Sequence, residues 1–80
     1  MTDKILVIGA CGQVGTELVE NLQSIHGNSQ VVVSDIRTPN SEVFSNSKFV
    51  HLNVLDKAQI KEGFQTHKPT IVYHLAALLS

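Results

Sequence analysis

The chain has 80 residues, a formal net charge of −1 and an apolar share of 42%, so it can form at most one small domain. A net charge this close to zero predicts no electrostatic binding to nucleic acid or to a membrane surface, and no apolar run reaches the length of a membrane span. The single cysteine, Cys11, excludes an intramolecular disulfide framework and is typical of a reducing compartment, so we expect a cytoplasmic protein.

The first predicted element is a buried strand over residues 4–9, a continuous apolar run that leads into three glycines with the spacing Gly9-x-x-Gly12-x-x-Gly15. In dinucleotide-binding units, the first glycine allows a sharp turn and the second removes a side chain where backbone meets a pyrophosphate. The third glycine lets the following helix pack closely against the sheet. The helix N-terminus then presents N–H groups and a positive dipole end to the anion. A P-loop is excluded, because no Gly-Lys-Ser/Thr follows.

A helix is predicted from Gln13 to His26, with Gly27 as its C-terminal cap. Apolar residues recur in it at helical spacing and are expected to form one buried stripe: Val14, Leu18, Val19, Leu22 and Ile25. A β-branched strand is predicted next, over residues 30–35.

Asp35 ends this second strand about 20 positions after the last glycine, which is the spacing of the acidic residue in dinucleotide-binding units. Its carboxylate is expected to accept hydrogen bonds from both adenosine-ribose hydroxyls and to repel a 2′-phosphate, which favours NAD over NADP. Arg37 keeps NADP open as an alternative, because an arginine can accept that phosphate.

The second half of the chain predicts an irregular connection over residues 37–47, a short strand over 48–52, a helix over 57–67 and a fourth strand over 70–74. Asp56 is a suitable N-cap for the helix, and Lys68-Pro69 ends it. Ile60 and Phe64 are four residues apart and are expected on its buried side.

This order, β-α-β-β-α-β, predicts an α/β fold with a parallel sheet of strand order 3-2-1-4, the N-terminal half of a doubly wound fold. Right-handed crossovers would place the two helices on opposite faces. Ligand is expected at the carboxyl ends of strands 1 and 4, where the winding reverses. Because the apolar fourth strand would be an edge, and two helices cannot cover both faces, we expect these residues to be part of a longer protein.

The remaining reactive side chains, one cysteine and four histidines, indicate neither a nucleophile nor a metal site. Cys11 is interpreted as a small buried residue, since nothing in the sequence places a base beside it. The histidines lack the spacing of metal ligands and have no cysteine partners, so no metal site is expected: His26, His51, His67 and His74.

The glycine spacing, the missing helix between the second and third strands and the segment 74–77 resemble the extended, epimerase-like branch of the short-chain dehydrogenase/reductase superfamily. Within that branch, three segments are most similar to the short-chain-type L-threonine 3-dehydrogenases: residues 9–18, 34–37 and 74–80. The resemblance implies that residues 1–80 are the N-terminal part of an NAD-binding Rossmann domain, without the catalytic and substrate-binding regions.

The resemblance also implies roles for individual residues. The residues of the glycine loop would hold the pyrophosphate, chiefly through the amides of Gln13 and Val14. These residues are Gly9, Cys11, Gly12, Gln13 and Val14. Those that would surround the adenosine are Asp35, Ile36, Arg37, Asn53 and Val54, where Asn53 replaces a frequent Asp and can still both donate and accept. Those that would line the path of the nicotinamide ribose are Leu75, Ala76 and Ala77, and Ser80 would contact the substrate.

In activity, the resemblance implies an intact homodimer that oxidises L-threonine at its 3-hydroxyl to 2-amino-3-oxobutanoate. The catalytic Tyr-x-x-x-Lys pair of that family is missing, because no lysine stands four residues after Tyr73. The 80-residue chain is therefore expected to hold no catalytic residue and to be inactive alone. Two alternatives stay open: a sugar-nucleotide epimerase or dehydratase of the same branch, and a non-catalytic NAD-binding module.

Overall fold

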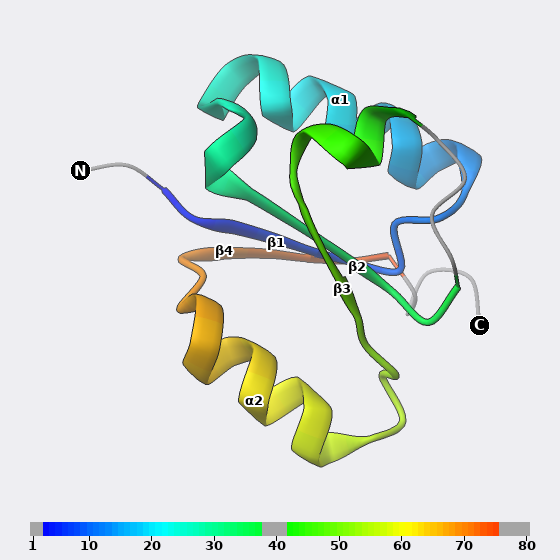
Figure 1. Cartoon of the computed structure of the whole chain (residues 1–80), viewed down its shortest axis with the longest axis vertical. Coiled ribbons are helices and arrows are strands. Elements are labelled where there is room, and N and C mark those ends of the chain that lie inside the picture. The colour runs from blue at the N-terminus through cyan, green and yellow to red at the C-terminus, as the bar shows by residue number, and fades with distance from the viewer. Residues whose placement is uncertain (1–2, 38–41, 76–80) are drawn as a thin grey trace.

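A four-stranded parallel sheet with helices on both faces forms the molecule in the computed structural model, which describes residues 3–37 and 42–75 (Figure 1). In chain order the elements are β1 (Ile5–Ile8), α1 (Gln13–His26), the short 3-10 helix η1 (Asn28–Gln30), β2 (Val31–Asp35), the 3-10 helix η2 (Glu42–Asn46), β3 (Lys48–His51), α2 (Lys57–His67) and β4 (Ile71–His74). The strand order is β3-β2-β1-β4. The α/β class and the order 3-2-1-4 are therefore confirmed.

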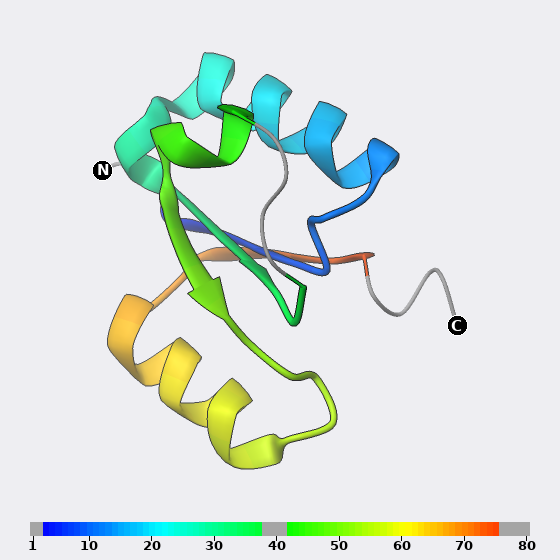
Figure 2. The same ribbon diagram turned by 45° about the vertical axis from the view of Figure 1, so that its right-hand side comes forward.

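The two central strands are buried along their whole length, because each has a strand on both sides and a helix above and below. Ile5 of β1 aligns with Val31 of β2 and with Ile71 of β4, so all three strands end near the same level. Alternate side chains of β1 and β2 contribute to two cores, one on the α1 face and one on the α2 face. Figure 2 shows α1 and η2 together on one face, with α2 on the other.

The buried face of α1 differs from the predicted stripe. Val19 and Leu22 are buried as expected and Leu18 is partly buried, but Val14 is 66% exposed and Ile25 is 74% exposed. The buried face is instead built from Gly15, Val19, Leu22 and Gln23. With 3.6 residues per turn, the two exposed residues lie roughly a quarter-turn or more from the centre of that face. Close packing of Gly15 sets this rotation of the helix.

The connection between β2 and β3 was predicted to be irregular, and η2 corrects that prediction over residues 42–46. Phe44 of η2 is 2% exposed and belongs to the core on the α1 face, where its ring lies 6.1 Å from that of Phe49. A single short 3-10 helix has too few residues to show a periodic pattern, so only its packing identifies it.

The second helix begins as predicted, because the Asp56 carboxylate accepts hydrogen bonds from the amides of Ala58 and Gln59. It ends with Lys68 in the left-handed conformation, φ 48°. Ile60 packs partly against the core, but Phe64, expected to be buried, is 40% exposed. Phe64 lies near the end of α2, where the helix leads into the edge strand β4 and less of the sheet is available to cover it.

Candidate functional site

The glycine loop joins the carboxyl end of β1 to the N-terminus of α1 and is held against β2. Gly9 has φ 81°, a backbone region that favours glycine. The amides of Gly9 and Ala10 both donate to the carbonyl oxygen of Ser34, at 2.9 and 3.1 Å, and the Gly12 amide donates to the Ala10 carbonyl at 2.8 Å. The loop is therefore fixed at the carboxyl edge of the sheet.

Gly15 lies where α1 comes closest to this loop. A Cβ atom at this position would overlap the carbonyl group of Ala10. Any other residue would push the helix away from the loop, so the close packing expected of the third glycine is present.

The first turn of α1 follows the glycine loop, and its first two residues are exposed to solvent. Gly12 is its N-cap with extended backbone, and within the described residues no side chain makes a capping hydrogen bond there. The first N–H groups of a helix have no partner within the helix. Gln13 and Val14 are both exposed. The start of α1 therefore has the features of an anion-binding helix N-terminus.

Asp35, at the end of β2, is hydrogen-bonded through its side chain to the glycine loop. Its side chain is only 4% exposed, and it accepts hydrogen bonds from the Cys11 amide at 2.8 Å and the Arg37 amide at 2.9 Å. Burial acts to raise the pKa of Asp35, but hydrogen bonds from the side chain and backbone of Arg37 and from the Cys11 backbone outweigh it and lower that pKa below its ordinary value. Asp35 is therefore an ionised hydrogen-bond acceptor at neutral pH.

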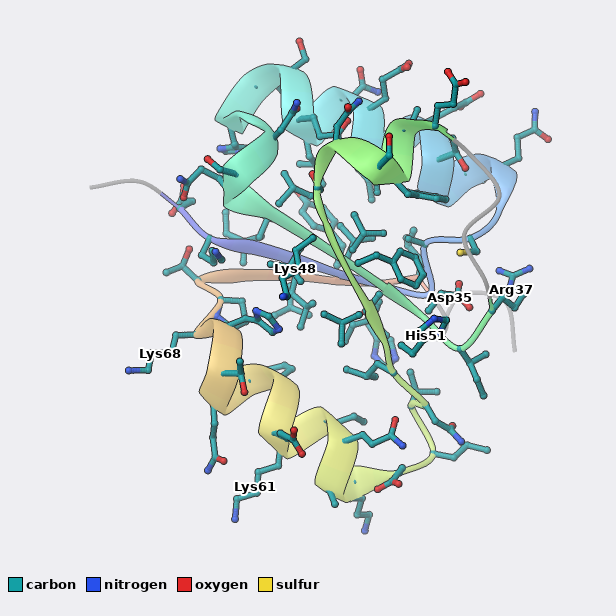
Figure 3. All side chains as sticks on the ribbon, viewed as in Figure 1. Asp35, Arg37, Lys48, His51, Lys61 and Lys68 are labelled. Carbon is teal, nitrogen blue, oxygen red and sulfur yellow. The ribbon has the colours of Figure 1, made fainter. Side chains whose placement is uncertain are left out.

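The Arg37 guanidinium lies against this carboxylate. Its Nε is 3.3 Å from Oδ1 of Asp35 and its Nη2 is 3.3 Å from Oδ2 (Figure 3). The same Nη2 is 3.8 Å from the position that a Cβ on Gly12 would occupy. The Arg37 side chain thus spans from Asp35 to the glycine loop, while remaining 56% exposed.

A cavity of about 230 Å³ opens at the same edge of the sheet, between the segments that follow β1, β2 and β3. Its lining residues are Gly9, Asp35, Ile36, Leu52, Asn53, Val54 and Leu55. Asn53 accepts a hydrogen bond from the Leu55 amide at 2.9 Å, which shapes the loop after β3. The cavity is mostly apolar, and Asp35 is the charged residue in its lining.

Two lining residues, Leu52 and Leu55, were not predicted as site residues. Leu52 follows the end of β3 and Leu55 lies three positions later. In a parallel sheet, residues after each strand gather at the same edge. Their place just beyond the third strand was therefore the signal that could have identified them.

A slightly larger cavity, of about 240 Å³, lies between β3 and α2. Its lining residues are Lys48, Val50, His51, Leu52, Gln59, Glu62, Gly63, Thr66 and His67. None of the predicted cofactor-binding residues lines it. We therefore place the candidate site at the glycine loop, where the cavity meets Asp35.

The structure brings most of the predicted residues to one edge. Gly9, Asp35, Ile36, Asn53 and Val54 line the same cavity, and the loop with Cys11 and Gly12 adjoins it through Asp35 and Arg37. Leu75 follows β4 and packs partly against the core on the α1 face. The predicted residues Ala76, Ala77 and Ser80 lie outside the described part of the chain.

Cys11 is a buried residue of this loop, and its thiol lies 3.9 Å from the Arg37 carbonyl oxygen. Burial raises the pKa of the Cys11 thiol, and the neighbouring Asp35 carboxylate raises it further. A thiol with a raised pKa is a poor nucleophile at neutral pH. These features support the structural interpretation of Cys11.

Within residues 3–37 and 42–75, no group of three or more His, Cys, Asp or Glu residues is arranged to hold a metal ion. No helix in this part of the chain is long and apolar enough to cross a membrane.

Known proteins are similar to this chain in sequence and in fold. An uncharacterized epimerase/dehydratase of Staphylococcus saprophyticus is 44% identical over 78 residues, which are 96% of this chain and 24% of that protein. A human protein described as an inactive mitochondrial L-threonine 3-dehydrogenase is 35% identical over 77 residues, 96% of this chain and 34% of that protein. The solved L-threonine dehydrogenase of Clostridium difficile superposes with a TM-score of 0.84 at 31% identity, covering 91% of this chain and 23% of that one.

The chain thus spans between about a quarter and a third of the length of these relatives. A model of the NAD dependent epimerase/dehydratase family matches residues 5–80, nearly the whole chain. The matched range includes all four strands of the sheet, the glycine loop and Asp35. This protein chain belongs to the NAD dependent epimerase/dehydratase family.

Proposed function

We propose that the carboxyl edge of this sheet binds NAD. The observation that supports this most strongly is the buried, ionised Asp35 carboxylate, which is held by the Cys11 amide of the glycine loop and belongs to a residue that lines the adjacent cavity. Dinucleotide-binding units use such a carboxylate for the ribose hydroxyls and the glycine loop for the pyrophosphate. The bound NAD would supply the acceptor for a hydride.

Each part of the cofactor has residues that suit it. The pyrophosphate would meet the first turn of α1, with Gly9, Cys11, Gly12, Gln13 and Val14 as the loop residues. The adenosine would occupy the cavity beside Asp35, with Ile36, Asn53 and Val54 from our prediction and Leu52 and Leu55 from the structure. For the nicotinamide end we retain the predicted Leu75, Ala76 and Ala77.

For the whole protein we propose NAD-dependent oxidation of L-threonine at its 3-hydroxyl, with Ser80 near the substrate. The proposal is supported by the likeness to solved threonine dehydrogenases, at a TM-score of 0.84 for the one from Clostridium difficile. We propose a cytoplasmic protein because of its single cysteine, and, in keeping with the resemblance, a homodimer that binds a small-molecule substrate. The chain itself would supply cofactor binding and no catalytic residue.

Two alternatives each have an observation in their favour. The staphylococcal relative is described as an epimerase/dehydratase, which favours turnover of a sugar nucleotide by the same branch. The human relative is described as inactive, which favours a cofactor-binding protein without catalysis.

Calorimetric titration of the 80-residue chain with NAD and NADP tests the binding proposal. We expect Asp35→Ala to weaken NAD binding about tenfold or more, because hydrogen bonds to a charged group contribute roughly 1.5–3 kcal/mol. Discrimination against NADP should also fall. Lys61→Ala, which removes an exposed charge on α2, is the control and should bind both cofactors as the wild type does.

Circular dichroism must show that each titrated variant is folded. Equal affinities of the wild type and Asp35→Ala for both cofactors would remove Asp35 from the site. A folded wild-type chain that binds neither NAD nor NADP would overturn the binding proposal itself.

The activity proposal is tested with an intact polypeptide that carries this sequence, assayed for NADH formation with L-threonine and for turnover of UDP- and dTDP-sugars. NADH formed only with L-threonine would support the dehydrogenase. Turnover of a nucleotide sugar without threonine oxidation would favour the epimerase, and cofactor binding without either reaction would favour the non-catalytic protein.

A further inference from the structure

The oxygen atoms that the proposed function assigns to the ribose already carry a full set of partners. A carboxylate offers about four lone-pair positions to hydrogen-bond donors. Asp35 accepts from the backbone of Cys11 and Arg37, at 2.8 and 2.9 Å, and from Nε and Nη2 of the Arg37 guanidinium, both at 3.3 Å. A ribose with two hydroxyls can bind this carboxylate only if existing donors leave.

The four donors differ in how readily they can leave. The Cys11 amide belongs to the buried glycine loop, and the Arg37 amide is fixed by the backbone two residues from Asp35. The two guanidinium bonds are longer and belong to a side chain that is 56% exposed. The guanidinium can therefore turn into solvent without moving any backbone, and its departure frees one position on each oxygen.

Resting on the proposed function, we propose that Arg37 competes with the adenosine ribose for Asp35, so that binding of the cofactor requires the guanidinium to leave the carboxylate. Arg37 is then a specificity-determining residue. By this competition, Arg37 lowers the affinity for any nucleoside that binds Asp35 through its ribose hydroxyls. The competition does not affect a nucleoside that lacks these hydroxyls.

Charge screening gives the competition a second signature. The Arg37 end of the ion pair is in contact with water, so added salt weakens it. Adenosine is neutral and has no salt-dependent attraction of its own to the loop. Raising the salt concentration should therefore strengthen adenosine binding in the wild type, by releasing Asp35, and should have no such effect once the guanidinium is absent.

The test titrates the 80-residue chain with adenosine and with 2′,3′-dideoxyadenosine, which lacks both ribose hydroxyls, and follows amide chemical shifts by NMR. The variants are Arg37→Ala and, as the matched control, Lys61→Ala, which removes a positive charge from the outer face of α2 far from Asp35 (Figure 3). The measured quantity is the preference for adenosine, the ratio of the dideoxyadenosine Kd to the adenosine Kd. This ratio cancels any contact of Arg37 with the adenine ring.

We expect the preference for adenosine to rise about twofold to fivefold in Arg37→Ala, the size of an ion pair with one exposed partner. Lys61→Ala should keep the wild-type ratio, and the salt effect should be seen in the wild type and in Lys61→Ala alone. Because Arg37 is half-exposed, its replacement leaves the core intact.

A ratio that is unchanged or lower in Arg37→Ala would overturn the inference while NAD binding by the wild type still stood. If no folded variant bound adenosine or NAD, the proposed function would fail, and this inference with it.

Discussion

Asp35 is the residue on which most of the candidate site depends, because one carboxylate contacts the glycine loop, its own following turn and Arg37. Its role is structural as well as functional. In the folded chain the charged form is favoured by three groups of hydrogen bonds, and these are absent from the unfolded chain. The ionisation of Asp35 is therefore linked to folding.

This linkage predicts a pH-dependent stability. The folded-state pKa of Asp35 is lower than the unfolded value of about 3.9. Ionised Asp35 therefore stabilises the fold above that unfolded value, and the contribution disappears as the pH falls through the folded-state pKa. Urea unfolding from neutral pH downward should show the wild type more stable than Asp35→Asn at neutral pH, with the gap closing in acid. A gap that stays constant with pH would contradict the linkage.

Gly15 and Gly63 are both buried helical glycines, and they should respond differently to the same substitution. In Gly15→Ala the new methyl group meets backbone atoms of Ala10, which cannot move without shifting the loop. We expect a loss of about 1–3 kcal/mol or more in the free energy of unfolding.

In Gly63→Ala the new Cβ lies 3.2 Å from Cδ1 of Leu52, the end of a flexible side chain. The helix also gains about 1 kcal/mol of propensity, so the net change should be within about 1 kcal/mol. Urea unfolding measures both variants. Equal losses in the two would show that Gly15 does not set the distance between helix and loop.

At the level of elements, α1 and η2 are joined by a polar bridge as well as by apolar packing. Gln23, buried on α1, donates from Nε2 to the Val43 carbonyl and to the Ser47 hydroxyl, each at 2.9 Å. Ser47 in turn donates to the Asn28 carbonyl, at 2.9 Å. These bonds hold the β2–β3 connection against the helix and so position Phe44 in the core.

Gln23→Met should therefore destabilise the fold by about 1–3 kcal/mol, because it keeps the shape of the side chain and removes both hydrogen bonds from a buried place. Gln65→Met, on the exposed side of α2, is the matched control and should change the free energy of unfolding by less than about 0.5 kcal/mol. Chemical denaturation compares the two variants, and similar effects would mean that the bridge contributes nothing.

At the scale of the whole molecule, the sheet is covered unevenly. β1 and β2 are enclosed on both faces, whereas β4 pairs with β1 alone among the described strands. Val72 of β4 is 39% exposed and Phe64 of α2 is 40% exposed. An apolar strand at a sheet edge is a template for pairing with another chain.

The 80-residue chain should consequently associate as its concentration rises, and Val72→Lys should reduce that association, because a charge on an edge strand opposes pairing. Ile25→Lys places the same charge on α1, on a residue that is 74% exposed and belongs to no strand, so it should leave strand pairing unchanged. Sedimentation velocity measures both. An effect of Ile25→Lys equal to that of Val72→Lys would place the association elsewhere.

Features set by neighbours along the chain could be predicted from the sequence alone. The Asp56 cap, the Gly27 end of α1 and the positive φ of Gly9 depend on local backbone geometry, which the residue type restricts. The strand order follows from the alternation of elements and the handedness of crossovers. The glycine spacing and the distance to Asp35 were therefore enough to predict the edge of the sheet at which the candidate site lies.

What only the tertiary structure decided is how the elements rotate and which side chains meet across loops. Contact of Gly15 with the Ala10 carbonyl turns α1, so Gln23 is buried and Val14 is exposed. The sequence places Leu52 and Leu55 just beyond the third strand, but only packing shows that both line the cavity beside Asp35. The Arg37 guanidinium lies on the carboxylate for a similar reason, because its direction depends on the loop opposite, and no sequence spacing encodes that direction.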